Sequence, residues 1–318
     1  MMDNIPPPKV AFIYNPASGA GKASLHLDDF KRLINKRWEF KSLCTDKDFV
    51  SEQVRELCEK GYNRIIVSGG DGTVREVING VMISTRNPIV GIIPQGTGND
   101  LARALGYYKK FMNNPLMYMN DLIAGMEKPK YRFCRILSLN GKVYFANYLG
   151  IGFDARIARK FHEKRFLPLY NRLIYLICII NSLPFKVKEQ IRISFKDTES
   201  RLYEKTIENF KNLLLLNILS YAGGLVKIGD IDTTGNAFHL MLMNGILEMI
   251  FFLLRGKLPE TFLPGKRIEI YKTDNVEISL PHNKVFIQID GEDFTDYLGN
   301  LQKLTIKSAG SIRFLCST

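Results

Sequence analysis

A glycine-rich segment carries the residue types that bind phosphate groups. Ser68 to Thr73 reads Ser-Gly-Gly-Asp-Gly-Thr and lies between a short apolar run and a helical pattern. Glycines let the backbone approach a ligand closely, and the N–H groups that open a helix can face an anion. Asp71 would repel phosphate unless a cation lay between them, so the segment predicts a metal-bound nucleotide with Asp71 organising the metal. An ordinary tight turn is the alternative interpretation.

Two more segments with small and polar residues follow other apolar runs. The segment from Asn15 to Lys22 has glycines and a lysine, but their spacing is not that of a Walker loop. The segment from Pro94 to Asp100 leads into a short helical run, which either Asn99 or Asp100 would cap well. Three such segments at one sheet edge predict a nucleotide site.

The elements that must position these segments alternate along the N-terminal half. Short apolar runs and longer amphipathic runs from Val10 to Leu105 predict βα units around a parallel sheet. The expected strands are Val10 to Tyr14, Glu39 to Cys44, Arg64 to Ser68 and Ile89 to Pro94. In such sheets ligands bind beyond the carboxyl ends of the strands, where all three segments fall.

The C-terminal half reads as mostly antiparallel strands. After a linker from Tyr107 and a helix around Leu116 to Ala124, the dipeptide Asn140-Gly141 predicts a hairpin. The expected strands are Tyr131 to Leu139, Lys142 to Tyr148, Lys188 to Phe195, Leu213 to Ser220, Ala237 to Met243, Arg267 to Tyr271, Val276 to Leu280, Val285 to Asp290, Leu304 to Lys307 and Ser311 to Leu315. We therefore expect an α/β domain over residues 1–130 and a β-sandwich over residues 131–318, whose last segment could pack back on the first domain.

One helical segment interrupts the β half. From Asp154 to Phe185 the chain is first strongly basic and then, from Leu173 to Ile180, strongly apolar. Such a segment could rest on an anionic membrane surface, or it could pack on the sandwich with a solvated charged face. A second apolar run, Ile246 to Leu254, could join the same surface or fill a core.

The composition indicates where in the cell the protein works and what kind of partner it binds. The net charge of +12 favours an anionic partner, which could be a nucleotide phosphate, a nucleic acid or an acidic membrane face. No apolar run is long enough for a membrane span and the N-terminus has no signal pattern, so we expect a cytoplasmic protein. The five cysteines and four histidines are scattered, without the spacing of a disulfide frame or a zinc site.

Four motifs in order give the chain a family resemblance. They are Asn15 to Gly19, Gly69 to Gly80, Gly96 to Arg103 and Asp290-Gly291-Glu292. With these motifs the chain resembles the diacylglycerol kinase catalytic domain family, whose lipid kinases also include sphingosine and ceramide kinases. The resemblance covers nearly the whole chain.

The resemblance implies a fold, cofactors and roles for residues. It implies an N-terminal α/β domain like that of NAD kinases and 6-phosphofructokinases, a C-terminal β-sandwich, and a site for ATP and Mg²⁺. The catalytic base maps onto Asp290, while Glu292 could hydrogen-bond the base, hold metal or lie in solvent. The metal maps onto Asp71. The residues assigned to nucleotide binding are Asn15, Ser18, Gly19, Thr45, Gly69, Gly70, Asp71, Gly72, Thr73, Glu76, Gly96, Thr97, Asn99 and Asp100.

The chain also departs from the family pattern. Arg75 stands where many members have Asn. Bacterial relatives often hold a structural Mg²⁺ with an Asp-Gly pair, but here the corresponding stretch has Asp230 and Asp232 in a shifted register. We therefore assign no second metal ion to this stretch.

The function expected from the sequence is that of an ATP-dependent kinase in phospholipid metabolism. It would phosphorylate a lipid hydroxyl while associated peripherally with the inner face of an anionic membrane. The lipid stays open, as does a homodimer. The rivals are an NAD kinase, which shares the Gly-Gly-Asp-Gly-Thr loop, and an inactive nucleotide- or lipid-binding protein of the same fold. Nucleic acid is not expected, because the basic residues are not interleaved with aromatic ones.

Overall fold

The structure is a computed structural model, and it divides the chain into two units. One unit consists of Met1–Cys134 with Ser311–Thr318, and the other is Arg135–Gly310. The residues that the structure describes are 7–34, 36, 38–45, 49–164, 171–224, 226–227, 232–245, 268–281, 285–298 and 301–316.

The first unit is built on the parallel sheet that the apolar runs predict. Its strands are β1 (Lys9–Tyr14), β2 (Glu39–Cys44), β3 (Arg64–Gly69) and β4 (Ile89–Pro94), and they lie in the order β2-β1-β3-β4. Every residue of β3 and β4 is buried, as expected for a sheet covered on both faces. The end of β17 (Lys303–Leu315) pairs parallel with β4 through Arg313 and Phe314. All four predicted strands of this half are confirmed to within a residue.

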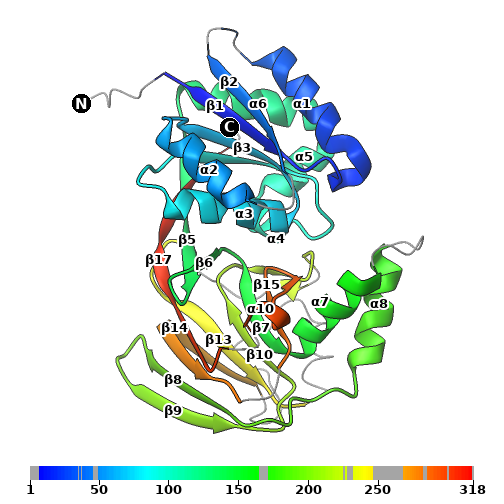
Figure 1. Ribbon diagram of the computed structural model, residues 1–318, viewed down its shortest axis with the longest axis vertical. Coiled ribbons are helices and arrows are strands. Elements are labelled where there is room, and N and C mark those ends of the chain that lie inside the picture. Colours follow the sequence, from blue (N-terminus) through cyan, green and yellow to red (C-terminus); the bar gives the residue numbers. More distant parts are fainter. Residues whose placement is uncertain are drawn as a thin grey trace. The chain divides into compact units, whose positions relative to one another are not determined.

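Helices cover both faces of this sheet (Figure 1). They are η1 (Ser18–Gly21), α1 (Lys22–Leu33), α2 (Val50–Glu59), α3 (Asp71–Ile83), α4 (Asp100–Ala104), α5 (Tyr107–Asn113) and α6 (Pro115–Glu127). The Asn114 side chain caps α6 by accepting from the Met117 N–H at 3.0 Å. The start of the expected linker is instead α5, because Phe111 packs edge-on against Tyr118, with ring centroids 5.7 Å apart.

The second unit is a mostly antiparallel sheet. Seven strands follow one another in the order β16-β15-β7-β10-β13-β14-β17, and β8 and β9 extend from β14. The strands are β5 (Tyr131–Leu139), β6 (Val143–Phe145), β7 (Tyr148–Gly152), β8 (Ile191–Asp197), β9 (Leu202–Ile207), β10 (Asn212–Leu216), β11 (Ser220–Tyr221), β12 (Val226–Lys227), β13 (Phe238–Met243), β14 (Ile268–Ser279), β15 (Ile287–Ile289) and β16 (Glu292–Asp293). The hairpin at Asn140-Gly141 is confirmed, with positive φ at both residues.

Two breaks between strands that the sequence predicts are absent from this sheet. The expected strands at 267–271 and 276–280 are one strand, β14, which contains an irregularity between Thr273 and Val276. The Thr273 hydroxyl donates to the Asn275 carbonyl at 2.9 Å, so these polar residues stabilise a bulge and not a turn. The strands expected at 304–307 and 311–315 are likewise continuous in β17. Strand β9, which the sequence interpretation missed, alternates exposed and half-buried residues and pairs only with β8 in the described sheet.

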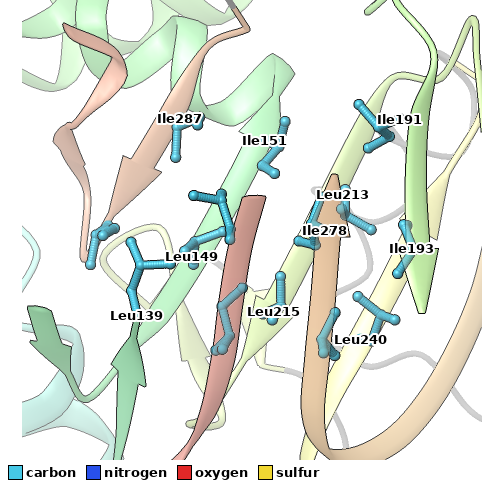
Figure 2. Packing of buried hydrophobic residues seen from close by; sticks show 14 of the residues in the cluster. Leu139, Leu149, Ile151, Ile191, Ile193, Leu213, Leu215, Leu240, Ile278 and Ile287 are labelled. Carbon is cyan, nitrogen blue, oxygen red and sulfur yellow. The ribbon is translucent and has the colours of Figure 1, made fainter. Parts of the chain in front are cut away.

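Alternate residues of these strands enclose one hydrophobic core (Figure 2). Leu149 and Ile151 of β7 point into it together with Leu213 and Leu215 of β10. Ile278 of β14 also packs into this core. Each fully buried aliphatic side chain contributes about 1.5 to 3 kcal/mol relative to exposure, so this core is the main stabilising feature of the unit.

Two helices occupy the segment that the sequence marks as basic and then apolar. They are α7 (Phe153–Lys164) and α8 (Asn171–Ser182), and Figure 1 shows them side by side. Phe153 and Ile157 of α7 form a second buried cluster with Ile174 and Cys178 of α8. No helix among the described residues is long and apolar enough to cross a membrane. The apolar run Ile246 to Leu254 lies outside the described residues.

Candidate functional site

Three loops of the first unit meet at the carboxyl ends of β1, β3 and β4. The Asn15 N–H donates to the Ser68 carbonyl at 3.1 Å, and the Asn15 side-chain amide donates to the Thr73 hydroxyl at 3.5 Å. The Gln95 N–H donates to the Gly69 carbonyl at 2.9 Å. The structure therefore brings together the three segments that the sequence singled out.

Two of these loops approach so closely that only glycine fits at residue 96. A Cβ on Gly96 would lie 2.4 Å from the Cα of Gly70, which is closer than real Cβ atoms come to a backbone atom. A Cβ on Gly98 would lie 2.7 Å from Oδ2 of Asp71, the end of a side chain that would have to turn away. The glycines therefore set the distance between the loop after β3 and the loop after β4.

The Asn99 side chain closes the loop after β4 instead of capping α4. Its Oδ1 accepts from the Gly96 N–H at 2.8 Å, and its Nδ2 donates to the Gly96 carbonyl at 2.6 Å. Asn99 itself has φ +53° and forms no side-chain cap hydrogen bond with α4. Asn99 is at the N-cap position of α4, but its amide is used within the loop, so capping by its side chain does not explain this residue. Asn tolerates this left-handed backbone better than most residues do.

Two carboxylates lie beside the same glycine. Asp71 opens α3, and Asp100 opens α4 with 2% of its surface exposed. The Cβ position built on Gly98 is 2.7 Å from Oδ2 of Asp71 and 3.6 Å from Oδ2 of Asp100. Both acids therefore lie beside Gly98, and carboxylate oxygens are ligands that a hard cation such as Mg²⁺ prefers.

The remaining predicted residues of the first unit differ in their surroundings. Thr97 is exposed at the tip of the loop after β4, and Thr45 is half-buried after β2 with its N–H donating to the Tyr14 carbonyl at 2.8 Å. The Ser18 N–H donates to the Asn15 carbonyl at 3.0 Å, and Gly19 lies against the Gln95 side chain. These four residues lie at the ends of β1, β2 and β4.

Glu76 has a different environment. One of its carboxylate oxygens accepts from the Ser51 hydroxyl of α2 at 2.5 Å, and the other forms an ion pair with Arg75 at 3.1 Å. The structure thus uses Glu76 to join α2 to α3. These two bonds of the Glu76 side chain, among the residues that the structure describes, are not with the three loops.

Two buried polar atoms at the loops have no hydrogen-bond partner among the described residues. They are the Ser68 hydroxyl oxygen and the Gln95 amide nitrogen. An unpaired buried polar atom costs about 1 to 3 kcal/mol, so it usually marks a place where a ligand or water binds. Ser68 is in β3, two residues before the N-cap residue Gly70 of α3, and the N–H groups that open such a helix attract anions. Gln95 directly follows β4, and its side chain lies against Gly19.

In the second unit Asp290 sits in a tight turn between β15 and β16. Its φ is +52° and that of Gly291 is +83°, as in the two-residue turns of hairpins. The side chain accepts from three successive backbone N–H groups, those of Asn147 at 3.0 Å, Tyr148 at 3.1 Å and Ala146 at 3.4 Å. These donors orient the carboxylate and stabilise its negative charge.

This contact explains an error in the strand prediction. The run Lys142 to Tyr148 was expected to be one strand, but β6 ends at Phe145 and β7 begins at Tyr148. The N–H groups in the break bind the Asp290 carboxylate and so are not available to a neighbouring strand. The break is therefore part of the site.

A buried network supports the Asp290 turn. Oε1 of Gln288 accepts from the Gly291 N–H at 2.8 Å, and Nε2 donates to Oδ2 of Asp154 at 2.9 Å. The Tyr221 hydroxyl donates to the same oxygen of Asp154 at 3.1 Å. Burial raises the pKa of Asp154, and the hydrogen bonds from Gln288 and Tyr221 oppose that shift.

Glu292 follows the turn as the first residue of β16. It pairs with Ile289 across the hairpin and is half-buried. The expected turn at Gly291 is confirmed, so Glu292 lies on the returning strand and does not continue β15.

The described part of the chain shows no cluster for a second metal ion. Among the described residues no group of three or more His, Cys, Asp or Glu side chains could hold one. Asp232 accepts from the N–H of Thr234 at 2.8 Å and from its hydroxyl at 2.6 Å, which is a local turn. Asp230 lies outside the described residues.

Three polar residues of these sites were not assigned from the sequence. Gln95 lies within a segment already marked, and Gln288 lies two residues before Asp290. Asp154 was seen only as the start of a basic helix. For Gln288, a polar residue between the apolar residues of a strand is the signal that could have marked it. Asp154 gives no such signal, because Tyr221 and Gln288, which donate to its carboxylate, come from β11 and β15, far along the chain.

Comparisons with known proteins agree with this arrangement. The model of the diacylglycerol kinase catalytic domain matches residues 9–129, and the model of the diacylglycerol kinase accessory domain matches residues 144–293. A diacylglycerol kinase of Bacillus subtilis (strain 168) is 25% identical over 294 residues, which cover 89% of each sequence. A diacylglycerol kinase of Staphylococcus saprophyticus is 41% identical over 100 residues, which cover 30% of this chain and 32% of that protein.

Solved structures support the fold. A crystal structure described as a diacylglycerol kinase of Bacillus anthracis (strain Sterne) matches 96% of both chains with a TM-score of 0.63 at 19% sequence identity. Together the two family models match most of the chain, in the order that the four sequence motifs predict. The chain belongs to the diacylglycerol kinase catalytic domain family and is a lipid kinase.

Proposed function

We propose that the chain transfers the γ-phosphate of ATP to the hydroxyl group of diacylglycerol or a related lipid at a membrane surface. The observation that carries this proposal is the Asp290 carboxylate, which is buried and accepts from three successive backbone N–H groups in the turn between β15 and β16. These donors hold the charged carboxylate in one orientation.

The three loops of the first unit are proposed to bind the nucleotide. The Gly69 to Thr73 loop opens α3, so backbone N–H groups and the helix dipole favour phosphate there. The unpaired Gln95 amide and the exposed Thr97 hydroxyl add donors beside it. Asn15 and Thr45 complete the proposed contacts at the ends of β1 and β2.

The acids beside Gly98 fit a magnesium ion that travels with the nucleotide. Mg²⁺ usually binds one or two carboxylates together with substrate phosphates, and Asp71 and Asp100 supply that number. We propose that these two residues hold the ion. When bound, Mg²⁺ neutralises phosphate charge.

Asp290 is proposed as the general base. The lipid hydroxyl oxygen forms a bond to the γ-phosphorus, the bond from that phosphorus to the β–γ bridging oxygen breaks, and Asp290 accepts the hydroxyl proton. The turn and its three donors keep the carboxylate in one orientation during this transfer. Glu292 is half-buried on the adjacent strand and is proposed to support the base.

The lipid is proposed from the names of the relatives. Diacylglycerol is favoured, because two of the relatives above are named diacylglycerol kinase. Apolar pockets discriminate weakly among lipid chains, so phosphatidylglycerol, a sphingoid base and an undecaprenol-like alcohol are also to be tested.

Replacing Asp290 by Asn tests the role of the base. Asn keeps the shape and an oxygen for the N–H groups of Asn147 and Tyr148, so the variant should melt within a few degrees of the wild type. We expect its turnover with lipid and ATP to fall by about two to four orders of magnitude. Asp274→Asn, on an exposed part of β14, is the matched control and should keep full turnover. An Asp290→Asn variant that retained most of its turnover would exclude Asp290 as the base.

A further inference from the structure

Helix α8 exposes an apolar stripe. Leu173, Leu176, Ile177 and Ile180 are 47%, 51%, 36% and 55% exposed. Their spacing of three and four residues puts them on one side of the helix. Ile174 and Cys178, on the other side, are buried against α7. The packing of α8 on its own unit therefore covers one apolar face and leaves a second one open.

A basic pocket lies at the C-terminal end of this helix. Its volume is about 380 Å³. The residues that line it are Arg156, Asn181, Pro184, Phe185, Lys186, Lys188 and Glu189. Three cationic side chains thus face one carboxylate, directly after Ile180 at the end of the apolar stripe.

The arginine of the pocket is held by aromatic rings. The guanidinium of Arg156 is 4.6 Å from the ring centroid of Phe185 and 5.9 Å from that of Phe286. Arg159, one turn further along α7, instead has Asp293 within 3.7 Å and Asp296 within 3.5 Å. Stacking engages the face of a guanidinium, whereas phosphate binds at its edge.

Positive charges accumulate around the pocket. The buried Lys211 ammonium donates to the carbonyls of Leu183 and Phe185 and so anchors the chain after α8. Burial lowers the pKa of Lys211, and the charges of Lys186 and Arg156 lower it further. Because these cations repel one another, an anion bound among them would be stabilised.

We propose that the α8 stripe and this pocket form a docking surface for an anionic phospholipid membrane. The stripe enters the interface between headgroups and acyl chains, and a lipid phosphate occupies the pocket beside Arg156, Lys186 and Lys188. Charge complementarity favours this occupant over a second copy of the chain, whose net charge of +12 would oppose contact at a basic surface. This inference rests on the proposed function in one respect: a lipid kinase must reach an acceptor lipid that lies in a bilayer.

Vesicle binding by the full chain, without ATP, tests this surface. Vesicles of phosphatidylcholine are compared with vesicles that also contain phosphatidylglycerol, and bound protein is measured by sedimentation. Leu176→Gln with Ile180→Gln should weaken binding to both vesicles about tenfold or more. Lys186→Gln with Lys188→Gln should weaken binding to the anionic vesicles about tenfold or more and leave binding to neutral vesicles unchanged.

Two control variants match these changes in chemistry. Leu202→Gln alters an apolar residue of β9 that is 60% exposed, and Lys196→Gln removes an exposed charge from β8. Both should bind vesicles like the wild type. Wild-type binding by the α8 and pocket variants would overturn the proposal, as would self-association of the wild type that Leu176→Gln with Ile180→Gln abolishes.

The proposed function is tested separately by phosphate transfer to lipid in detergent micelles. If the wild type bound vesicles but transferred no phosphate, the proposed function would be contradicted and the proposed docking surface would still be supported. A wild type that transfers phosphate, together with pocket variants that bind vesicles normally, would contradict the docking surface alone.

Discussion

Gln288 is the residue on which the Asp290 turn depends most directly. It is 1% exposed, and both ends of its amide are used, one by the Gly291 N–H and one by the Asp154 carboxylate. An apolar side chain of similar length would leave the Gly291 N–H and the buried Asp154 carboxylate each without one partner.

Replacing Gln288 by Met should therefore destabilise the fold. We expect the free energy of unfolding, measured by urea denaturation, to fall by about 1 to 3 kcal/mol, since a buried polar group that loses a hydrogen-bond partner costs about that amount. Gln302→Met, at an exposed position before β17, is the control and should change stability by less than about 0.5 kcal/mol. Equal stability of the two variants would show that the network does not support the turn.

Single residues differed in how far the sequence predicted them. The turn at Asp290 could be predicted, because it follows from the dipeptide Asp-Gly itself, whereas the role of Asp290 as a base stays a prediction from the family resemblance. The role of Asn99 could not, because a cap and a loop closure use the same amide, and only the fold decides between them. Asp154 could not either, since the residues that hydrogen-bond its carboxylate are 67 and 134 positions away.

At the scale of elements, the closeness of two loops is the feature that the proposed nucleotide site needs. The loops after β3 and β4 touch at Gly70 and Gly96. A methyl group at residue 96 would meet the Gly70 backbone, which is not a flexible group and has to move as a whole.

The substitution Gly96→Ala should push these loops apart. We expect the affinity for ATP with Mg²⁺, measured by titration calorimetry, to fall about tenfold or more, because the loop N–H groups would no longer converge on one phosphate chain. Gly61→Ala is the control: Gly61 has a positive φ of +85°, so alanine strains the backbone there, but its Cβ would meet nothing within 4 Å. It should lose some stability and keep its affinity. If Gly96→Ala bound ATP with Mg²⁺ as tightly as the wild type, the contact between these loops would not be needed for nucleotide binding.

The elements of the parallel sheet were predictable because their signals are local. Each strand from β1 to β4 is a short run, and three of the four are largely apolar and bounded by polar or small residues. The long strands β14 and β17 were not predictable as single strands. A polar bulge at Thr273 and the sequence Ser308-Ala309-Gly310 look like turns, and long-range pairing with β8, β13 and β4 makes them continuous.

At the scale of the whole molecule, the half-buried His239 links stability to pH. His239 of β13 pairs with Lys272 in the sheet. Burial lowers the pKa of His239 from its ordinary value of 6.5 to about 4, and the charges of Lys272 and Arg135 contribute to that shift. Its Nδ1 atom has no hydrogen-bond partner among the described residues. The folded chain therefore keeps this imidazole neutral.

Stability should consequently fall as the pH drops from 6.5 towards 4. In this window the unfolded chain binds a proton at His239 and the folded chain does not, so acid favours unfolding. Between pH 7 and pH 5 we expect a loss of roughly 1 to 2 kcal/mol from this residue, allowing for its partial exposure. His239→Gln should remove that part of the pH dependence in urea denaturation. An identical loss in the variant and the wild type would mean that His239 is not responsible.

The assignment of the whole chain was predictable from four motifs, whereas the surface of α8 was not. The sequence left two interpretations of the basic and apolar segment open, because a helical pattern alone does not tell which side meets the core. The exposed fractions of Leu176 and Ile180 show that part of the apolar surface of α8 stays uncovered by its own unit.

The most direct measurement of the central proposal is phosphate transfer from ATP labelled at the γ-phosphate. The full chain is incubated with Mg²⁺ and, in parallel, with diacylglycerol, other extracted lipids and NAD. We predict that the label appears in a lipid, most strongly in diacylglycerol, and that it is lost in Asp290→Asn. Label in NAD alone, or no transfer to any lipid by the folded wild type, would contradict the account.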